Sequence, residues 1–144
     1  MPSHEHLAEV IREWVEKAEN DLKNASHTLK LGKECPVDTV CFHAQQCVEK
    51  YLKGVLILRS IPFPKTHDIE ALYALLPPSA RPHLSQMDQK QLTRYVTAMR
   101  YPGDYLPITL AEARSSVVLA RRIRKEIRAI LPRAALRPRR IGRV

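Results

Sequence analysis

The sequence is poor in glycine, has no paired cysteines and lacks a long apolar run, and each absence excludes a class of protein. Only 4 of its 144 residues are glycine, which disfavours a turn-rich β fold. No stretch approaches the roughly 20 continuous apolar residues of a membrane-spanning helix. The first residues, MPSHEH, have neither the basic nor the apolar part of a signal peptide. We therefore expect a cytoplasmic protein that does not enter a membrane.

The cysteines and histidines form no recognisable disulfide or metal pattern. Cys35, Cys41 and Cys47 are odd in number and contain no CxxC pair, so we expect neither a disulfide framework nor a zinc site. The six histidines are scattered and match no known ligand spacing. We expect no metal and no cofactor, and we interpret the cysteines as small buried apolar residues.

Apolar residues recur at helical spacing along most of the chain, whose length suits one domain. The spacing and its stop signals predict helices over residues 7–31, 36–59, 68–76, 88–100 and 109–131. Asp88 can cap the fourth of these, and Thr109 with Glu112 forms a capping box for the fifth. No segment alternates long enough to make a strand. The predicted fold is all-α: residues 1–132 form an up-and-down bundle of four longer helices and one short helix.

The predicted helix over residues 36–59 has two distinct faces. At 100° per residue the apolar side gathers Val40, Ala44, Cys47, Val48, Tyr51 and Val55, and the opposite side gathers His43, Gln46, Glu49, Lys50 and Lys53. One interpretation of the polar side is a solvated surface, on which Glu49 and Lys53 form an i,i+4 ion pair worth about 0.3–0.5 kcal/mol. The alternative is a binding strip, in which Lys50 and Lys53 meet phosphate or the edge of a base.

The net charge of +9 is concentrated at one end of the chain. Residues 113–144 carry 11 Lys and Arg against one acid, whereas residues 1–112 carry 13 against 14 acids. Towards its C-terminal end the last predicted helix gathers Arg121, Arg122, Arg124, Lys125 and Arg128. They suit a polyanion such as RNA, or they form a solvated helix face that aids solubility. Residues 133–144 contain five Arg and little to bury, and we predict a basic, disordered tail.

Four stretches of the sequence, taken together and in order, resemble the HEPN (higher-eukaryote and prokaryote nucleotide-binding) family in its small stand-alone prokaryotic form. They are Trp14, Ala18, Asp21-Leu22 and Ala25; FHAQQCVEKYLK at 42–53; PKTHDI at 64–69; and RYP at 100–102. The resemblance implies a helical bundle that usually forms a homodimer. It also implies a nucleotidyltransferase encoded nearby, often within a toxin–antitoxin or defence pair.

Several branches of that family are metal-independent ribonucleases, and this sequence departs from their catalytic motif. The motif has an Arg and a His with four to six residues between them, so that the imidazole acts on the ribose hydroxyl while the Arg stabilises the phosphorane. After Arg100 the corresponding positions hold Tyr105, Leu106 and Pro107, and no other Arg in the chain has a His at that separation. We therefore expect no RNA cleavage of the usual kind and name no catalytic residue.

The segment from Arg100 to Tyr105 remains suited to binding. Arg100 offers a planar fork of donors for phosphate, and Tyr101 and Tyr105 offer ring faces on which a base could stack. Asp104 completes the candidate set. The alternative is structural, with Arg100 at a helix C-terminus and the tyrosines packed on the bundle. The resemblance adds one further role, nucleotidylation of Tyr105 by the partner enzyme.

Three functions remain open at this point. The first is a nucleotide- or RNA-associated binding module that regulates, or is regulated by, a nucleotidyltransferase. The second is a ribonuclease toxin that uses Arg100 without the His. The third is a structural bundle that docks a partner protein and gains only electrostatic attraction from its basic residues.

Overall fold

The computed structural model describes residues 3–100 and 107–138, apart from the side chains of residues 98–100. It contains helices α1 (His4–Leu29), α2 (Val37–Leu58), α3 (Ile69–Leu75), α4 (Gln86–Arg100), α5 (Leu110–Arg128) and α6 (Arg133–Leu136), with 3₁₀ turns at Gly32–Glu34 and Pro78–Ala80. The all-α prediction is confirmed, and each predicted helix is present within three residues of its expected ends. None of the described helices combines the length and apolarity needed to cross a bilayer.

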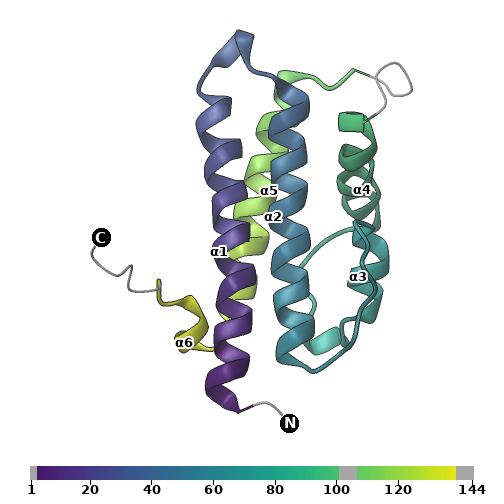
Figure 1. Ribbon diagram of the computed structural model, residues 1–144. Coiled ribbons are helices and arrows are strands. Elements are labelled where there is room, and N and C mark those ends of the chain that lie inside the picture. Colours follow the sequence, from purple (N-terminus) through teal and green to yellow (C-terminus); the bar gives the residue numbers. More distant parts are fainter. Residues whose placement is uncertain (1–2, 101–106, 139–144) are drawn as a thin grey trace.

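The chain forms an up-and-down bundle with α2 in its middle (Figure 1). Helix α2 runs antiparallel to α1 on one side, faces the α3–α4 hairpin on the other, and packs on α5 behind it. Because α2 has neighbours on several sides, its burial is not confined to one stripe. Apart from Phe42, its apolar residues from Val40 to Leu56 have no exposed surface, and three of them, Cys41, Leu52 and Leu56, lie off the predicted apolar side.

The core follows the predicted helical spacing on α1. Ala8, Ile11, Val15, Ala18, Leu22 and Ala25 are all buried against the rest of the bundle. Several of them are alanines, so α1 and α2 approach closely, while larger residues such as Ile11 and Tyr51 fill the space between. Complete burial of a side chain of that size stabilises the fold by about 1.5–3 kcal/mol.

The helix ends agree with the predicted signals at two positions and differ at a third. Gly32 adopts a left-handed φ of 62° just after α1, a conformation that glycine tolerates at helix ends. The side chain of Thr109 accepts a 3.0 Å hydrogen bond from the Glu112 amide, as a cap of α5 should. The prediction that Asp88 caps α4 is wrong, because Ser85 Oγ accepts from the Asp88 amide and the helix already begins at Gln86.

The prediction of a disordered tail from residue 133 is wrong for its first residues. Residues 133–136 form the short helix α6, which packs on α1. Ala135 is completely buried there, and Arg12 Nη2 of α1 donates a 2.6 Å hydrogen bond to the Ala134 carbonyl. The sequence reading missed this turn because a single buried alanine gives no periodic signal. Residues 139–144 lie outside the described part of the chain.

Candidate functional site

The polar side of α2 is covered rather than solvated, which overturns the first interpretation of that face. Glu49 retains only 3% side-chain exposure and pairs with Lys53, itself 8% exposed, over 3.0 Å. His67, from the segment between α2 and α3, donates from Nδ1 to Glu49 Oε1 at 2.8 Å. Gln45 bonds both the Glu49 carboxylate and the His67 carbonyl. The i,i+4 pair is therefore the centre of a buried polar network.

A second carboxylate makes a similar arrangement where α1 crosses α2. Asp21 Oδ1 lies 2.8 Å from His43 Nδ1, and Asp21 Oδ2 lies 2.5 Å from Lys50 Nζ. Asp21 is buried, whereas His43 and Lys50 keep about a fifth to a quarter of their side-chain surface. Asp21 thus ties two positions of α2, two helical turns apart, to α1.

Both networks stabilise the fold rather than offer a site for an anion, because their cations are already paired with carboxylates. Each carboxylate neutralises one lysine, so Lys50 and Lys53 do not present free charge in the described structure. Lys53 is further enclosed by aromatic rings, 5.5 Å from the Trp14 centroid and 5.8 Å from that of Phe63. The Asp21–Lys50 pair joins α1 to α2 and so favours one register of the two helices, whereas the Glu49–Lys53 pair lies within α2. The predicted ligand-binding role of Lys50 and Lys53 gains no support from this geometry.

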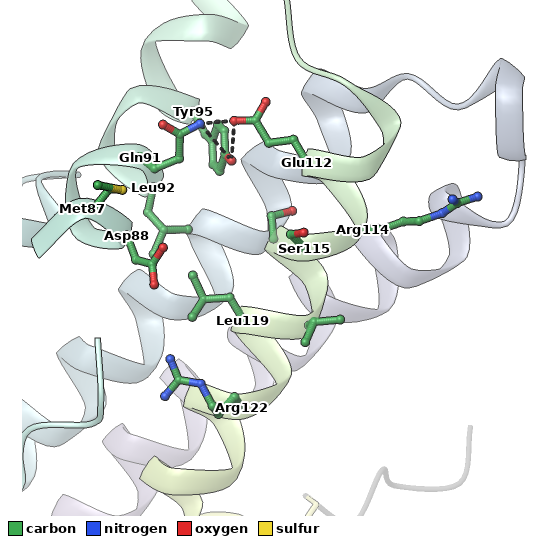
Figure 2. Close-up of a pocket in the computed structure, with 12 residues that line it drawn as sticks. Met87, Asp88, Gln91, Leu92, Tyr95, Glu112, Arg114, Ser115, Leu119 and Arg122 are labelled. Atoms are coloured by element: carbon green, nitrogen blue, oxygen red, sulfur yellow. Dashed lines mark hydrogen bonds between the residues drawn. The ribbon is translucent and has the colours of Figure 1, made fainter. Parts of the chain in front are cut away.

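A groove between α4 and α5 is the most ligand-like feature of the described residues (Figure 2). Its volume of about 610 Å³ falls in the range of small-molecule sites. The floor is apolar or buried, with Leu92 and Tyr95 from α4 and Ser116 from α5. At the rim, Met87 and Val118 are 80% and 65% exposed. The sequence did not predict this groove, because helical spacing does not show where two helices diverge.

The two ends of the groove differ in chemistry. At one end the Gln91 amide and the Tyr95 hydroxyl both donate to Glu112 Oε1 (Figure 2). Burial raises the pKa of Tyr95, so its hydroxyl keeps its proton at neutral pH. At the other end stands Arg122, whose Nη1 bonds Glu126 at 2.7 Å. The groove therefore joins an amide–carboxylate cluster to a guanidinium across an apolar floor.

The predicted ligand-binding segment lies largely outside the described residues. Tyr101, Asp104 and Tyr105 are not described, and neither is the side chain of Arg100, the last residue of α4. In the sequence this segment joins the end of α4 to the start of α5, the two helices that form the groove. The binding roles assigned to it stay predictions.

The basic residues of α5 divide into three kinds. Arg124 Nε and Arg128 Nη1 donate to Glu19 Oε1 of α1 at 2.6 and 3.1 Å, and the buried Tyr51 hydroxyl donates to the same oxygen. Arg121 bonds Ser26 of α1, and Arg122 bonds Glu126. Lys125 is exposed beside Arg121 and Arg124. The sequence did not predict the role of Glu19, which orients two guanidinium groups of α5.

The cysteines are free and buried, as expected of small apolar residues. Burial raises the pKa of Cys41 to about 11 and raises that of Cys47 as well, so both stay as unreactive thiols near neutral pH. Among residues 3–100 and 107–138, no cluster of His, Cys, Asp and Glu has the geometry to hold a metal ion.

Comparisons with known proteins agree with this architecture. The sequence matches the HEPN domain over residues 11–130. The structure is similar to the crystal structure of TT1696 from Thermus thermophilus, with a TM-score of 0.69 and 28% identity over 84% of this chain and 98% of that one. It is also similar to ST0689, described as an archaeal HEPN homologue, with a TM-score of 0.62 and 26% identity over 85% of this chain and 98% of that one. No curated protein matches the sequence significantly.

Proposed function

Because this chain belongs to the HEPN domain family, we propose that it is a nucleotide- or RNA-associated binding module that acts in the cytoplasm beside a nucleotidyltransferase, in a toxin–antitoxin or defence-type pair. The observation that carries the proposal is the groove between α4 and α5, which has the volume of a small-molecule site. In the sequence, the segment that holds Arg100, Tyr101 and Tyr105 connects the two helices that form the groove.

The groove suits a mononucleotide in three respects. Its apolar floor at Leu92 and Tyr95 offers a surface for the flat base. The Gln91 amide and the Glu112 carboxylate supply a donor and acceptors for the base edge, once they exchange their mutual bond for bonds to the ligand. Arg122, at the other end, supplies a cation for phosphate. None of these groups performs chemistry on the ligand, which favours binding over catalysis.

The ribonuclease alternative gains no support from the described residues. His43, His67 and His83 are each held by a carboxylate, and none of the three lines the α4–α5 groove. None of them follows an Arg at the family's spacing. A cleavage reaction would therefore depend on Arg100 alone to stabilise charge, without a general base beside it.

Filling the groove should abolish nucleotide binding without unfolding the protein. Ser115 lines the groove and is exposed, so Ser115→Trp occupies the space without disturbing the core. We expect isothermal titration with ATP to give binding to the wild type and at least about tenfold weaker binding to Ser115→Trp. Ser79→Trp is the matched control, since Ser79 is exposed on the 3₁₀ turn Pro78–Ala80 and does not line the groove. Absence of ATP binding by the wild type, alone and with its nucleotidyltransferase, would refute the proposal.

We also propose that the groove rim is where a second copy of this chain docks, so that a homodimer closes the site. Met87 and Val118 are the most exposed large apolar residues of the described chain, and both line the groove. Light scattering should give twice the 16.5 kDa chain mass for the wild type and a single chain mass for Val118→Glu. Leu31→Glu is the control, because Leu31 is 60% exposed but lies away from the groove. A dimer that survives Val118→Glu would place the interface elsewhere.

A further inference from the structure

A second surface, on the opposite side of α5 from the groove, gathers cations from helices that are distant in the sequence. Arg12 and Lys23 of α1 and Arg121, Arg124, Lys125 and Arg128 of α5 line two adjoining hollows, of about 270 and 440 Å³. We call these six residues the basic strip. The hollows share Glu19, Lys23 and Arg124, so they form one continuous depression between the two helices.

The strip extends beyond these six residues at both ends. Towards the end of α1 a third hollow shares Lys23 and Ser26 with its neighbour and adds Lys30. Towards the C-terminus Arg137 lines the first hollow just after α6. From Arg12 to Lys30 the helix rises about 27 Å at 1.5 Å per residue. The cations therefore lie along a line, which suits a linear polyanion better than one isolated phosphate.

The guanidinium groups of the strip are held in place and retain free donors. Glu19 binds Arg124 through Nε and Arg128 through Nη1, which leaves most of the five N–H groups of each guanidinium unused. Arg12 is held by the Ala134 carbonyl of α6, and its buried Nε has no hydrogen-bond partner among the described residues. The carboxylates that line the same two hollows are Glu16 and Glu19, and the six cations of the strip outnumber them. The strip therefore keeps an excess of positive charge together with free N–H donors.

The composition of the strip selects the kind of polyanion. No Phe, Tyr or Trp side chain lines its hollows, so it lacks the large aromatic platforms on which successive bases stack. The exposed large apolar residues of the described chain lie elsewhere, so the strip lacks the apolar groups by which a protein inserts into a membrane surface. It is a shallow, open depression between α1 and α5. These features together favour a sugar–phosphate backbone lying along it.

We propose that the basic strip binds single-stranded RNA along its phosphate backbone, without regard to base sequence. This inference rests on the proposed association with nucleotides or RNA and assigns it a second site, behind the groove. Phosphate contacts position a nucleic acid without reading it. The groove between α4 and α5 would then engage a nucleotide while the strip holds the strand to which it belongs.

The test compares two triple variants that remove the same charge: Lys23→Ala/Arg121→Ala/Lys125→Ala in the basic strip, and Lys33→Ala/Lys65→Ala/Lys90→Ala away from it. Lys23, Arg121 and Lys125 are exposed in the strip, and Lys33, Lys65 and Lys90 are exposed away from it. Binding to a fluorescein-labelled oligouridine of about 15 nucleotides is followed by anisotropy between about 50 and 200 mM KCl. We expect the strip alanine variant to lose affinity at least tenfold and to lower the slope of log K against log salt by about 2, at about 0.7 per phosphate contact. The variant Lys33→Ala/Lys65→Ala/Lys90→Ala should keep the affinity and the salt slope of the wild type.

Other outcomes would overturn the proposal. Equal losses in the two triple variants would mean general charge attraction, and no binding by the wild type would remove the basis for a strip. Binding to phosphatidylglycerol vesicles or to polyglutamate, with none to the RNA, would assign the strip to a membrane or an acidic protein instead. Ser115→Trp separates the two sites: RNA binding that persists when ATP binding is lost leaves the strip intact. If the wild type binds RNA but not ATP, only the groove proposal fails.

Discussion

Glu49→Ala should destabilise the protein by about 3–5 kcal/mol, because the partners of Glu49 in its buried network are polar or charged. The substitution leaves Lys53 as a buried charge without its partner and removes the acceptor of His67 and Gln45. Removing one member of a buried ion pair lowers the free energy of unfolding, because the remaining charge stays desolvated and has no opposite charge to compensate for the lost hydration. Thermal unfolding followed by circular dichroism should show a fall in Tm of about 10 °C or more.

Two controls separate this mechanism from a general loss of side chain. Glu126→Ala removes the half-buried partner of the exposed His83 and Arg122, and should change the free energy of unfolding by at most about 1 kcal/mol. The double variant Glu49→Leu/Lys53→Met removes both charges and should be more stable than Glu49→Ala. A Glu49→Ala protein that unfolds within about 1 kcal/mol of the wild type would show that the network is not buried in solution.

Glu19→Ala should lower stability by about 2–3 kcal/mol and at the same time strengthen RNA binding. Stability falls because the Tyr51 hydroxyl, which is buried, loses its acceptor, and because Arg124 and Arg128 lose the anion between them. RNA affinity rises, by up to about fivefold, since the variant removes a carboxylate from the basic strip and an exposed charge interaction is worth up to about 1 kcal/mol. Urea unfolding and the anisotropy titration measure the two effects.

The opposite signs distinguish this prediction from simple unfolding, which would weaken both properties. Glu9→Ala is the matched control: Glu9 is exposed on the same helix and outside the strip, so stability and RNA affinity should both stay close to the wild type. Tyr51→Phe isolates the hydroxyl and should lose stability without any gain in RNA affinity. A Glu19→Ala protein that binds RNA more weakly while still folded would contradict the role assigned to the strip.

Much of the architecture could be predicted from local chemistry. Helical spacing located every long helix, and the stripe from Ala8 to Ala25 on α1 is the one that packs. Thr109 and Glu112 predicted the start of α5, and Gly32 the end of α1. The amino-acid order also shows that the ribonuclease motif lacks its His after Arg100. These features depend on neighbours within a few residues, and such neighbours are visible in the order of the amino acids.

The candidate sites depended on neighbours that the sequence does not show. Spacing places Glu49 and Lys53 on the polar side of α2, but it cannot show that His67 and Phe63 fold back over that side and remove it from water. Spacing likewise identifies Arg124 and Arg128 as one face of α5, but Glu19 meets them from more than a hundred residues earlier.

What the sequence by itself determined is therefore where the helices lie, which of their sides are apolar and which family chemistry is missing. What only the tertiary structure decided is which polar residues are buried pairs, which cations line one groove, and where α4 and α5 leave a space between them. The physical reason is that helix periodicity fixes the direction of a side chain around its own axis, whereas burial and charge pairing depend on what other segment arrives at that side.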